Sequence, residues 1–390
     1  MKAERGFIMK KAVHFGAGKI GCGFIGDLLH DSGYEIVFAD VVQAAIDNLN
    51  ATHDYRLFLI NHDYQEKVID HISALNSVTE PEKVAAAIAD ADILTTSVMA
   101  SNLGKVAPVI AQGLKKRLMV RNDKLIVMAC ENAIMGTDIL KKELMQTGVL
   151  TSEELEQAAV YPNTAVDRMV FSGKHGGHRG IEVSDSYELA VEQVKLPEGN
   201  KEPIRGAEYV AELEPYLQRK IYIINGGHAI SAYLGKAQGK TTVQDVLHDS
   251  QLLPKVRGAM LEAAAALEKM YGFPHQKLVD YMEKLMVGRF TTPGVSDPVE
   301  RVGREPIRKL SPQDRIMGPA LKCQELGLPN DYLLQGAASA FHFTNSEDQQ
   351  AVELQDYIQK NGIEAAIERY TTVSPESSMF NKILQAYQKI

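Results

Sequence analysis

KAVHFGAGKIG, residues 11–21, decides the fold of this chain. Its first five residues, which include Ala12, Val13 and Phe15, predict a buried β-strand. The glycines that follow, Gly16, Gly18 and Gly21, have the spacing GxGxxG. Helical periodicity then continues to about Ser32. Strand, glycine-rich turn and helix in this order are typical of the first unit of an α/β fold.

The next strand supplies the second half of this signal. Residues 35–39 read EIVFA and predict a strand that ends at Asp40. In a dinucleotide-binding unit the glycines let the backbone approach a pyrophosphate, and the following helix offers free N–H groups. The carboxylate of Asp40 accepts hydrogen bonds from ribose hydroxyls and repels a 2′-phosphate, so we expect NAD as cofactor. The alternative is a glycine-rich turn in another α/β fold.

The rest of the chain falls into two regions of different character. Up to about residue 195, short apolar runs alternate with helical patterns, which predicts a parallel sheet. Residues 196–206, LPEGNKEPIRG, are polar with two prolines and indicate a domain boundary. Beyond them helical patterns dominate, beginning with an expected helix over 207–224. We therefore predict an α/β Rossmann-type domain over 1–195 and a mostly α-helical domain over 196–390.

The first domain is predicted to contain further strands and helices after Asp40. The predicted strands after Asp40 are 56–60, 66–69, 93–97 and 125–129. The predicted helices are 42–50, 81–89 and 102–117, followed by two further helices and a shorter strand region. Residues 1–8 are expected to precede the first strand, without the apolar region of a signal peptide.

Composition excludes several classes of protein. The 390 residues are 45% hydrophobic and carry a formal net charge of -8, which disfavours nucleic-acid and membrane-surface partners. No run of about 20 apolar residues is present to span a membrane. The three cysteines have neither disulfide-framework nor metal-ligand spacing, so we expect a cytoplasmic protein without a metal. A monomer or a small homo-oligomer is expected.

A second motif lies in the region expected to be helical. Lys220, Asn225 and His228 have the spacing K-x4-N-x2-H. On an ideal helix these three residues fall within an arc of roughly 140°. Gly226 and Gly227 cost about 1 kcal/mol each within a helix, which close approach of a ligand or of another backbone would explain. The spacing alone leaves open a helix end with surface polar residues.

Several segments together resemble the polyol-specific long-chain dehydrogenases and reductases. These are the opening HFGAGKIGCGFIG, the segment YPNTAVDR at 161–168, the K-x4-N-x2-H motif, and VGREPIRKLSPQDR at 302–315. The resemblance covers nearly the whole chain and implies a Rossmann domain followed by a helical one. The compact length is more similar to the branch acting on a hexitol phosphate than to the longer members. The implied reaction is reversible oxidation of D-mannitol 1-phosphate to D-fructose 6-phosphate with NAD.

The resemblance also implies roles for four residues. Lys220 takes the proton of the reacting hydroxyl as a general base, without a metal. Asn163 and Asn225 donate amide hydrogens to the oxygen as it gains negative charge. His228 binds a neighbouring substrate hydroxyl and fixes its position.

Two further groups of residues are candidates for ligand contact. Glu131 and Asn132 end a predicted strand on its carboxyl side and are expected to contact the nicotinamide ribose or the substrate, although strand-end structure alone explains them equally well. For the phosphate of a sugar phosphate substrate we expect Arg304, Arg308 or Lys309, because guanidinium and ammonium groups bind phosphate. The alternative there is a solvated loop with ion pairs.

Two other functions stay open on the sequence alone. A relative acting on an unphosphorylated polyol or a hexuronate has the same general motifs. A non-catalytic NAD-binding regulatory protein with a helical interaction domain is a different class, and the intact Lys220, Asn225 and His228 argue against it.

Overall fold

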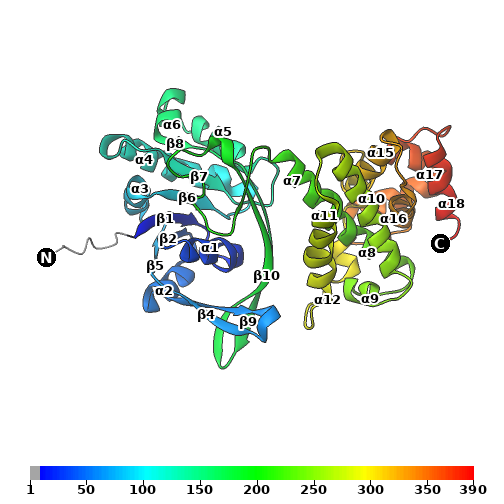
Figure 1. Cartoon of the computed structure of the whole chain (residues 1–390), viewed down its shortest axis with the longest axis horizontal. Helices are drawn as coiled ribbons and strands as arrows, with labels where there is room; N and C mark the ends of the chain where they lie inside the picture. The colour runs from blue at the N-terminus through cyan, green and yellow to red at the C-terminus, as the bar shows by residue number, and fades with distance from the viewer. Residues whose placement is uncertain (1–8) are drawn as a thin grey trace. The chain divides into compact units, whose positions relative to one another are not determined.

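The computed structural model describes residues 9–390, which form two compact units divided between Leu213 and Glu214 (Figure 1). The expectation for residues 1–8 lies outside the described residues. The division falls after Leu213 rather than near Lys195, because strand β11 pairs with β10 and so ties residues 208–210 to the first unit. Each unit is described by itself below.

The first unit contains a parallel sheet of six strands in the order β5-β2-β1-β6-β7-β8. Its strands are β1 (Lys10–Phe15), β2 (Tyr34–Asp40), β5 (Ile72–Asn76), β6 (Ile93–Thr96), β7 (Leu125–Ala129) and β8 (Ala159–Val160). β1 pairs with β2 on one side and with β6 on the other. The direction of winding therefore reverses beside β1, at the edge where open α/β sheets bind their ligands. The predicted Rossmann-type fold of this unit is confirmed, while β5 was missed by the sequence analysis.

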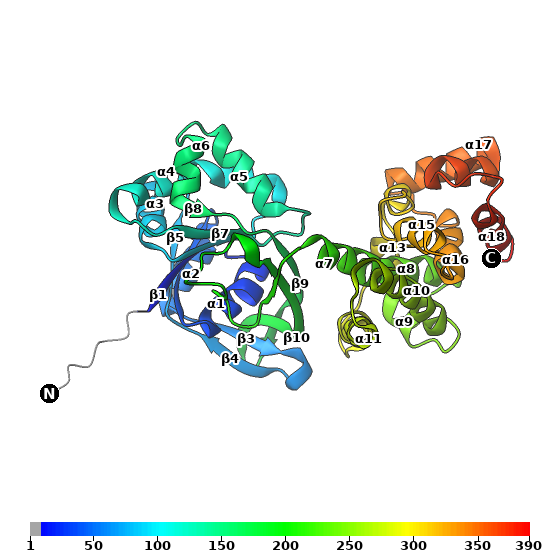
Figure 2. The same ribbon diagram turned by 45° about the horizontal axis from the view of Figure 1, so that its top comes forward.

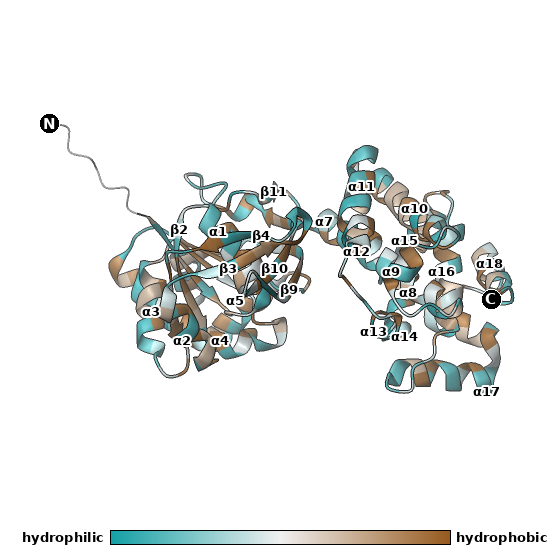
Figure 3. Ribbon diagram, turned by 90° about the horizontal axis from the view of Figure 1, so that it is seen from below, coloured by the Kyte–Doolittle hydropathy of each residue, from teal (hydrophilic) through white to brown (hydrophobic). Residues whose placement is uncertain are grey.

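Helices cover both faces of this sheet. They are η1 (Gly21–Gly26), α1 (Asp27–Asp31), α2 (Gln43–Thr52), α3 (Pro81–Asp90), α4 (Leu103–Val120), α5 (Gly136–Gln146) and α6 (Ser152–Ala158). Successive residues of β1 alternate between two apolar clusters: Ala12 belongs to the one with α1 and α2, and Val13 to the one with α3 and α4. Figure 3 accordingly shows the inner strands largely in brown, the colour of hydrophobic residues. Strands buried on both faces are expected of a parallel sheet.

A second, smaller sheet lies against the first helix. It consists of β3 (Tyr55–Leu59), β4 (Gln65–Ile69), β9 (Thr164–His175), β10 (His178–Glu192) and β11 (Glu208–Val210). Phe24 in the first helical segment packs in one cluster with Ile36 of the parallel sheet and Val183 of β10, so this segment lies between the two sheets (Figure 2).

The long hairpin β9–β10 differs from the shorter strand region that we expected. His175 pairs with His178 across a two-residue turn, in which Gly176 and Gly177 have φ of +57° and +87°. Two successive positive φ values are characteristic of a type I′ turn, which favours glycine and suits the twist of a hairpin. A tight two-residue turn therefore joins two strands that are longer than expected.

The second unit is mostly α-helical, as predicted. Its elements are α7 (Glu214–Arg219), η5 (Lys220–Asn225), α8 (Gly226–Ala237), α9 (Val243–Leu247), α10 (Leu253–Tyr271), α11 (His275–Met282), η6 (Glu283–Gly288), α12 (Arg289–Thr291), α13 (Val299–Val302), α14 (Pro306–Lys309), α15 (Met317–Glu325), α16 (Asp331–Phe341), α17 (Gln349–Thr371) and α18 (Ser378–Tyr387). The helix expected over 207–224 is wrong at its beginning, where the chain forms β11. Across residues 9–390, no helix is long and apolar enough to cross a membrane.

Candidate active site

The glycine loop of the first unit has the steric properties that a dinucleotide requires. Gly16 has φ +102°, and a Cβ atom there would lie 2.6 Å from the Ser97 carbonyl oxygen. A Cβ at Gly21 would lie 1.8 Å from the carbonyl oxygen of Gly16, so only glycine fits either position. A Cβ at Gly18, in contrast, meets nothing within 4 Å. That open side, next to the beginning of a helix, fits a pyrophosphate approaching the backbone.

Asp40 fastens this loop to the end of β2. Its Oδ2 accepts a hydrogen bond from the Ala17 backbone nitrogen at 2.6 Å, and its Oδ1 accepts from those of Val41 and Val42 at 2.7 and 2.9 Å. A carboxylate has about four lone-pair sites, of which three are used here. The structure therefore gives Asp40 an architectural role and leaves acceptor capacity for a ribose hydroxyl, which stays a prediction.

The buried side chains of Cys22 and His14 pack beneath the glycine loop, on its side toward the protein interior. Cys22 is buried with its Sγ 3.4 Å from the Ala17 carbonyl oxygen, and burial, together with nearby Asp40, raises the pKa of its thiol to about 12. His14 is fully buried between the hydroxyls of Thr95 and Ser97, at 2.7 and 2.8 Å from its two ring nitrogens. Burial lowers the pKa of His14 to about 3, so the ring is neutral at physiological pH. Both side chains are structural supports of the loop.

Glu131, at the end of β7, holds the neighbouring loop that follows β6. Its Oε1 accepts hydrogen bonds from the Thr96 hydroxyl at 2.7 Å and the Val98 backbone nitrogen at 2.9 Å. Its Oε2 accepts from the backbone nitrogen of Met99 at 2.9 Å, where φ is +72°. These contacts give Glu131 a structural role at the end of the strand, which was one of the two alternatives from the sequence. Asn132 follows it on the exposed side, and contact of either residue with cofactor or substrate stays a prediction.

Asn163 lies just before β9 and is only 1% exposed. Its Oδ1 accepts hydrogen bonds from the backbone nitrogens of Thr137 and Asp138, both at 3.1 Å, at the first turn of α5. These two bonds fix the orientation of the amide. Its Nδ2 then points toward Glu192 Oε2 at 3.4 Å, which takes one of the two amide hydrogens. The amide is therefore held in one orientation, and its role as a donor to the reacting oxygen stays a prediction.

In the second unit, Lys220–Asn225 is a π-helical segment rather than ordinary α-helix. Its wide turn closes between residues five apart, which brings Lys220 and Asn225 nearer to one face than the 140° arc of an ideal α-helix allows. Such segments occur frequently at functional sites. His228 follows in the first turn of α8, and Lys220 is 9% exposed. The three residues thus come from one continuous helical stretch.

The two glycines of this stretch are explained by close packing. A Cβ at Gly226 would lie 2.8 Å from the carbonyl oxygen of Arg315, and one at Gly227 would lie 2.4 Å from the sulfur of Met260. Close approach of another backbone, one of the two expected explanations, therefore accounts for Gly226. Through this contact the K-x4-N-x2-H stretch lies directly against Arg315, at the end of the segment 302–315.

His228 is held by residues that the sequence analysis did not select. Its Nε2 lies 2.8 Å from Asp297 Oδ2, and its ring stacks on Phe290 with 4.4 Å between centroids. Burial lowers the pKa of His228, although Asp297 opposes this effect. For Asp297, burial raises the pKa, and the bonds from His228 and Arg301 outweigh it, so the net shift is downward. The lowered pKa of His228 favours its neutral form, and the lowered pKa of Asp297 favours the carboxylate.

The three residues expected to bind phosphate have different surroundings. Lys309 donates from Nζ to the carbonyl oxygens of Val302 and Arg304 at 2.5 Å each, and it is 6% exposed. Burial, with Arg315 and Arg308 nearby, lowers the pKa of Lys309 to about 7. Its amino group holds the segment through these two carbonyl oxygens rather than facing solvent.

The two arginines differ in how strongly they are engaged. Arg308 is bound to Glu305 and to Asp314, with nitrogen–oxygen distances of 2.7 and 2.9 Å. Arg304 is 53% exposed at its side chain, and its ion pair with Glu347 is longer, at 3.7 Å. Of the three, Arg304 therefore has the guanidinium that is most available to an anion.

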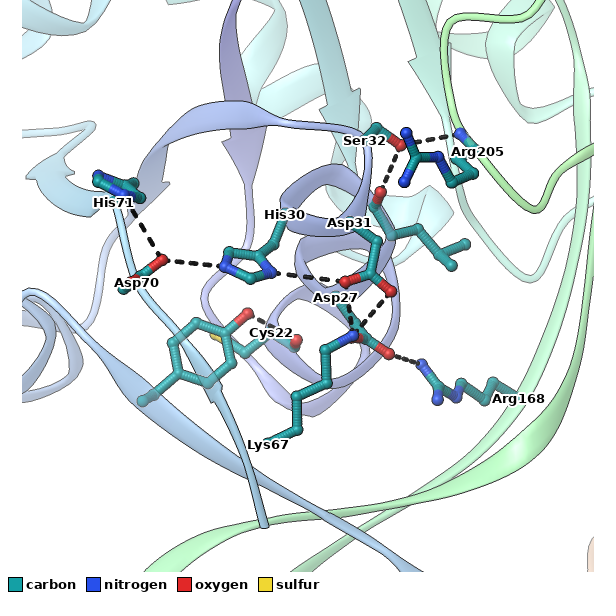
Figure 4. A network of polar contacts seen from close by, with 12 residues as sticks. Cys22, Asp27, His30, Asp31, Ser32, Lys67, Asp70, His71, Arg168 and Arg205 are labelled. Atoms are coloured by element: carbon teal, nitrogen blue, oxygen red, sulfur yellow. Dashed lines mark hydrogen bonds and ion pairs between the residues drawn. The ribbon is translucent and has the colours of Figure 1, made fainter. Parts of the chain in front are cut away.

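A buried ion pair, also missed from the sequence, ties the first helix to the hairpin β9–β10. Arg168 Nη1 lies 2.6 Å from Asp27 Oδ2, and the side chains are 3% and 5% exposed. Lys67 reaches the other oxygen of Asp27 at 2.6 Å, as Figure 4 shows. The available signal was that Arg168 alternates with Val166 and Val170 along a predicted strand. Among residues 9–390, no group of three or more His, Cys, Asp or Glu side chains could hold a metal ion.

The first unit, with its glycine loop at the switch point of a parallel sheet, and the second, with its helical lysine–asparagine–histidine stretch, define an NAD-dependent oxidoreductase of the Rossmann class. Comparisons with known proteins make this assignment specific. The profile of the mannitol dehydrogenase Rossmann domain matches residues 10–202, and that of the mannitol dehydrogenase C-terminal domain matches residues 212–390. The chain belongs to the mannitol dehydrogenase family.

Individual relatives cover almost the whole chain. A mannitol-1-phosphate 5-dehydrogenase of Exiguobacterium sp. is 38% identical over 97% of this chain and 97% of its own. One of Paenarthrobacter aurescens is 40% identical over 95% of this chain and 96% of its own. The solved ternary complex of Pseudomonas fluorescens mannitol 2-dehydrogenase with NAD and D-mannitol matches with TM-score 0.68 and 17% identity, over 98% of this chain and 91% of that one. A substrate-free D-sorbitol dehydrogenase matches with TM-score 0.80 and 16% identity, over 98% and 93%. At these identities the two structures show the shared fold alone.

Proposed function

We propose that this enzyme interconverts D-mannitol 1-phosphate and D-fructose 6-phosphate with NAD as the redox partner. The observation that carries the proposal is the set of relatives named mannitol-1-phosphate 5-dehydrogenase, which are 37–40% identical over at least 95% of both chains. The K-x4-N-x2-H stretch supports it, because it contains Lys220, Asn225 and His228, three of the four residues to which the resemblance assigns a role.

Lys220 is proposed to handle the proton of this reaction. NAD⁺, when bound at the glycine loop, supplies the acceptor for the hydride that leaves carbon 5. The neutral amine of Lys220 takes the proton of the carbon-5 hydroxyl, so that the carbon–oxygen bond becomes a carbonyl. In the reverse direction its ammonium returns a proton to that oxygen. Because Lys220 is 9% exposed, bulk water has little access to the proton that it carries.

Amide groups are proposed to stabilise the negative charge that develops on the reacting oxygen. Asn225 belongs to the same π-helical segment as Lys220. Asn163 in the first unit has its amide orientation fixed by Thr137 and Asp138. Donors that are oriented before the reaction cost no reorganisation during it. His228 is proposed to bind an adjacent substrate hydroxyl and so to select the orientation of the chain of carbons.

The phosphate of the substrate is proposed to bind in the segment 302–315. Arg304 is our first choice within it, because its guanidinium is exposed and only loosely paired with Glu347. A guanidinium can donate two parallel hydrogen bonds to a phosphate. An uncharged sugar lacks a charged acceptor group of this kind, so it binds more weakly at the same arginine.

The proposal is tested by NADH oxidation with fructose 6-phosphate, compared at equal concentrations with fructose and with fructuronate. We expect rapid turnover with the phosphate ester and at least about 100-fold lower kcat/KM with fructose, since a charge-assisted phosphate contact contributes about 1.5–3 kcal/mol and more than one donor is expected. Equal or higher efficiency with fructose or fructuronate would assign the enzyme to an unphosphorylated substrate. No NADH oxidation with any of the three would favour a non-catalytic NAD-binding protein.

A further inference from the structure

The imidazole of His228 is constrained on both its edge and its face. Asp297 Oδ2 lies 2.8 Å from Nε2 at one edge. Phe290 stacks against one face with an interplanar angle of 20° and a centroid distance of 4.4 Å. Rotation of the ring by half a turn would place a C–H edge against the carboxylate and lose the hydrogen bond. The ring therefore has one preferred orientation, in which Nδ1 lies on the edge away from Asp297.

Asp297 is itself held in place by two other side chains. Arg301 donates to its Oδ1 from Nε at 2.8 Å and from Nη2 at 2.5 Å. The Asp297 backbone nitrogen donates to Gln244 Oε1 at 2.9 Å. Asp297 is 7% exposed, so few water molecules compete for its oxygens. One carboxylate oxygen is thus occupied by Arg301, and the other is directed at His228.

The chemistry of this pair fixes which ring nitrogen carries the proton. An ionised carboxylate only accepts hydrogen bonds, so a neutral His228 in contact with it must be protonated at Nε2. Nδ1 then carries a lone pair and can only accept. The side chain of His228 is 22% exposed, which leaves part of the ring accessible to a ligand.

We propose that Asp297 is a positioning residue for the reaction: it holds His228 in the Nε2–H tautomer, so that Nδ1 accepts a hydrogen bond from a substrate hydroxyl. Contact with a hydroxyl rests on the proposed function, whereas the tautomer does not. The contrasting possibility is an ion pair between a protonated His228 and Asp297 that only stabilises the fold. The two possibilities differ in the protonation of Nδ1.

The direct test measures this protonation in the unmodified enzyme. The protein is labelled with ¹⁵N-histidine, and the ring nitrogens of His228 are assigned from the signals that vanish in His228→Gln. At pH 7.5 we expect Nε2 to have the shift of a protonated nitrogen and Nδ1 that of an unprotonated one. Protonation of Nδ1, alone or together with Nε2, overturns the proposal. This measurement needs no substrate, so it is independent of the proposed reaction.

The kinetic test replaces Asp297 by asparagine. Asp297→Asn keeps the shape, but its amide can donate to Nε2 and so move the proton of His228 to Nδ1, as an aspartate-to-asparagine change does in the serine protease triad. We expect the ¹⁵N shifts to report this tautomer. We expect kcat/KM for fructose 6-phosphate to fall about 10- to 100-fold, the range for a lost buried hydrogen bond, with the dissociation constant of NADH within about 2-fold of wild type.

A matched control is Glu268→Gln, because Glu268 Oε2 lies 3.1 Å from Nδ1 of His275 in an exposed pair of the same unit. We expect this variant to keep wild-type kinetics. Unchanged kinetics in Asp297→Asn, despite an altered tautomer, would contradict a positioning role. If Asp297→Asn does not fold, the wild-type spectrum still decides the tautomer. Absence of any activity in the wild type counts against the proposed function and leaves the spectrum as the test of the pair.

Discussion

Arg168 and Asp27 form a buried ion pair, with 2.6 Å between Nη1 and Oδ2, that joins strand β9 to the helix following the glycine loop. Arg168 also donates to the carbonyl oxygens of Gly23 and Ser184, at 3.0 and 2.8 Å. Its guanidinium therefore connects the wide first turn of that helix with both strands of the hairpin. The arginine of the segment YPNTAVDR serves the architecture around the glycine loop.

Replacing Arg168 by methionine should destabilise the first unit strongly. Removing one partner of a buried ion pair costs about 3–5 kcal/mol, because the other charge stays buried. Lys67 remains 2.6 Å from Asp27, so we expect a loss of free energy of unfolding near the lower end of that range. Chemical denaturation of Arg168→Met measures it. Arg56→Met, which removes an exposed pair with Glu66, is the control and should change the stability by less than about 1 kcal/mol. Equal losses in both variants would contradict the account.

His14 should make the stability of the protein depend on pH. Burial holds the pKa of His14 at about 3, below its ordinary value of 6.5, so the unfolded chain binds a proton that the folded protein does not. The stability that the folded protein has because His14 stays neutral is fully present above pH 6.5. It is lost as pH falls from there toward 3, and the free energy of unfolding then decreases by up to about 1.4 kcal/mol for each pH unit. Denaturation curves of wild type and His14→Gln at pH 7 and pH 5 measure it. The variant should be less stable at pH 7 but lose less stability at pH 5.

The control for His14 is His71→Gln, because the side chain of His71 is 60% exposed. This variant should keep the wild-type difference between the two pH values. A His14→Gln protein with the full wild-type pH dependence would show that other groups cause the acid sensitivity.

The fold signals that were local in the sequence were predicted, and those that depend on distant partners were not. β1, the glycine turn and Asp40 lie within 30 residues, and each has its own chemical signature. Strand β10 pairs with β9 in a local hairpin, but it also pairs with β3, which is remote in sequence: Ile181 lies opposite Leu57. The same holds for side chains: Arg168 and Asp27 are 141 positions apart, and His228 and Asp297 are 69 apart.

Within the site, sequence spacing gave the residues but not their geometry. Lys220 and Asn225 were placed on an ordinary α-helix, because a π-helical segment has no spacing signature of its own. The glycines after them predicted a close approach, yet only the structure identifies Arg315 and Met260 as the neighbours.

Cofactor choice should depend on Asp40. We expect NAD to be used more efficiently than NADP, because the carboxylate repels a 2′-phosphate. Asp40→Asn should narrow the gap between the two cofactors by about 10-fold or more, since it removes the charge that repels a 2′-phosphate. Its one amide oxygen can still accept either from the backbone nitrogens of Val41 and Val42 or from that of Ala17. Asp47→Asn in helix α2 is the control, because Asp47 is exposed and its Oδ1 accepts a hydrogen bond from Gln43 Nε2 at 2.8 Å. The measurement is the ratio of kcat/KM for NAD to kcat/KM for NADP. If this ratio is the same in Asp40→Asn as in the wild type, Asp40 does not select the cofactor.

Phosphate recognition should depend on Arg304. Its side chain is 53% exposed, so Arg304→Ala should fold normally and raise KM for fructose 6-phosphate about 10-fold or more, with NADH binding unchanged. The control is Arg257→Ala, which removes a similarly exposed arginine bound to Glu283 in the same unit. If Arg304→Ala, Arg308→Ala and Lys309→Ala each leave KM unchanged, none of these three residues binds the phosphate.

The most direct test of the account is the rate of NADH oxidation by Lys220→Ala with fructose 6-phosphate. Because Lys220 is assigned the transferred proton, we expect kcat to fall about 10²–10⁴-fold, the usual contribution of acid–base catalysis, while NADH affinity stays near that of wild type. Small primary amines added to the variant should restore part of the rate by occupying the vacated space. Lys236→Ala, at the far end of α8 and paired with Glu300, is the matched control and should keep full activity. A Lys220→Ala enzyme with near-wild-type turnover would contradict the assignment of Lys220 and, with it, the proposed roles of Asn225 and His228.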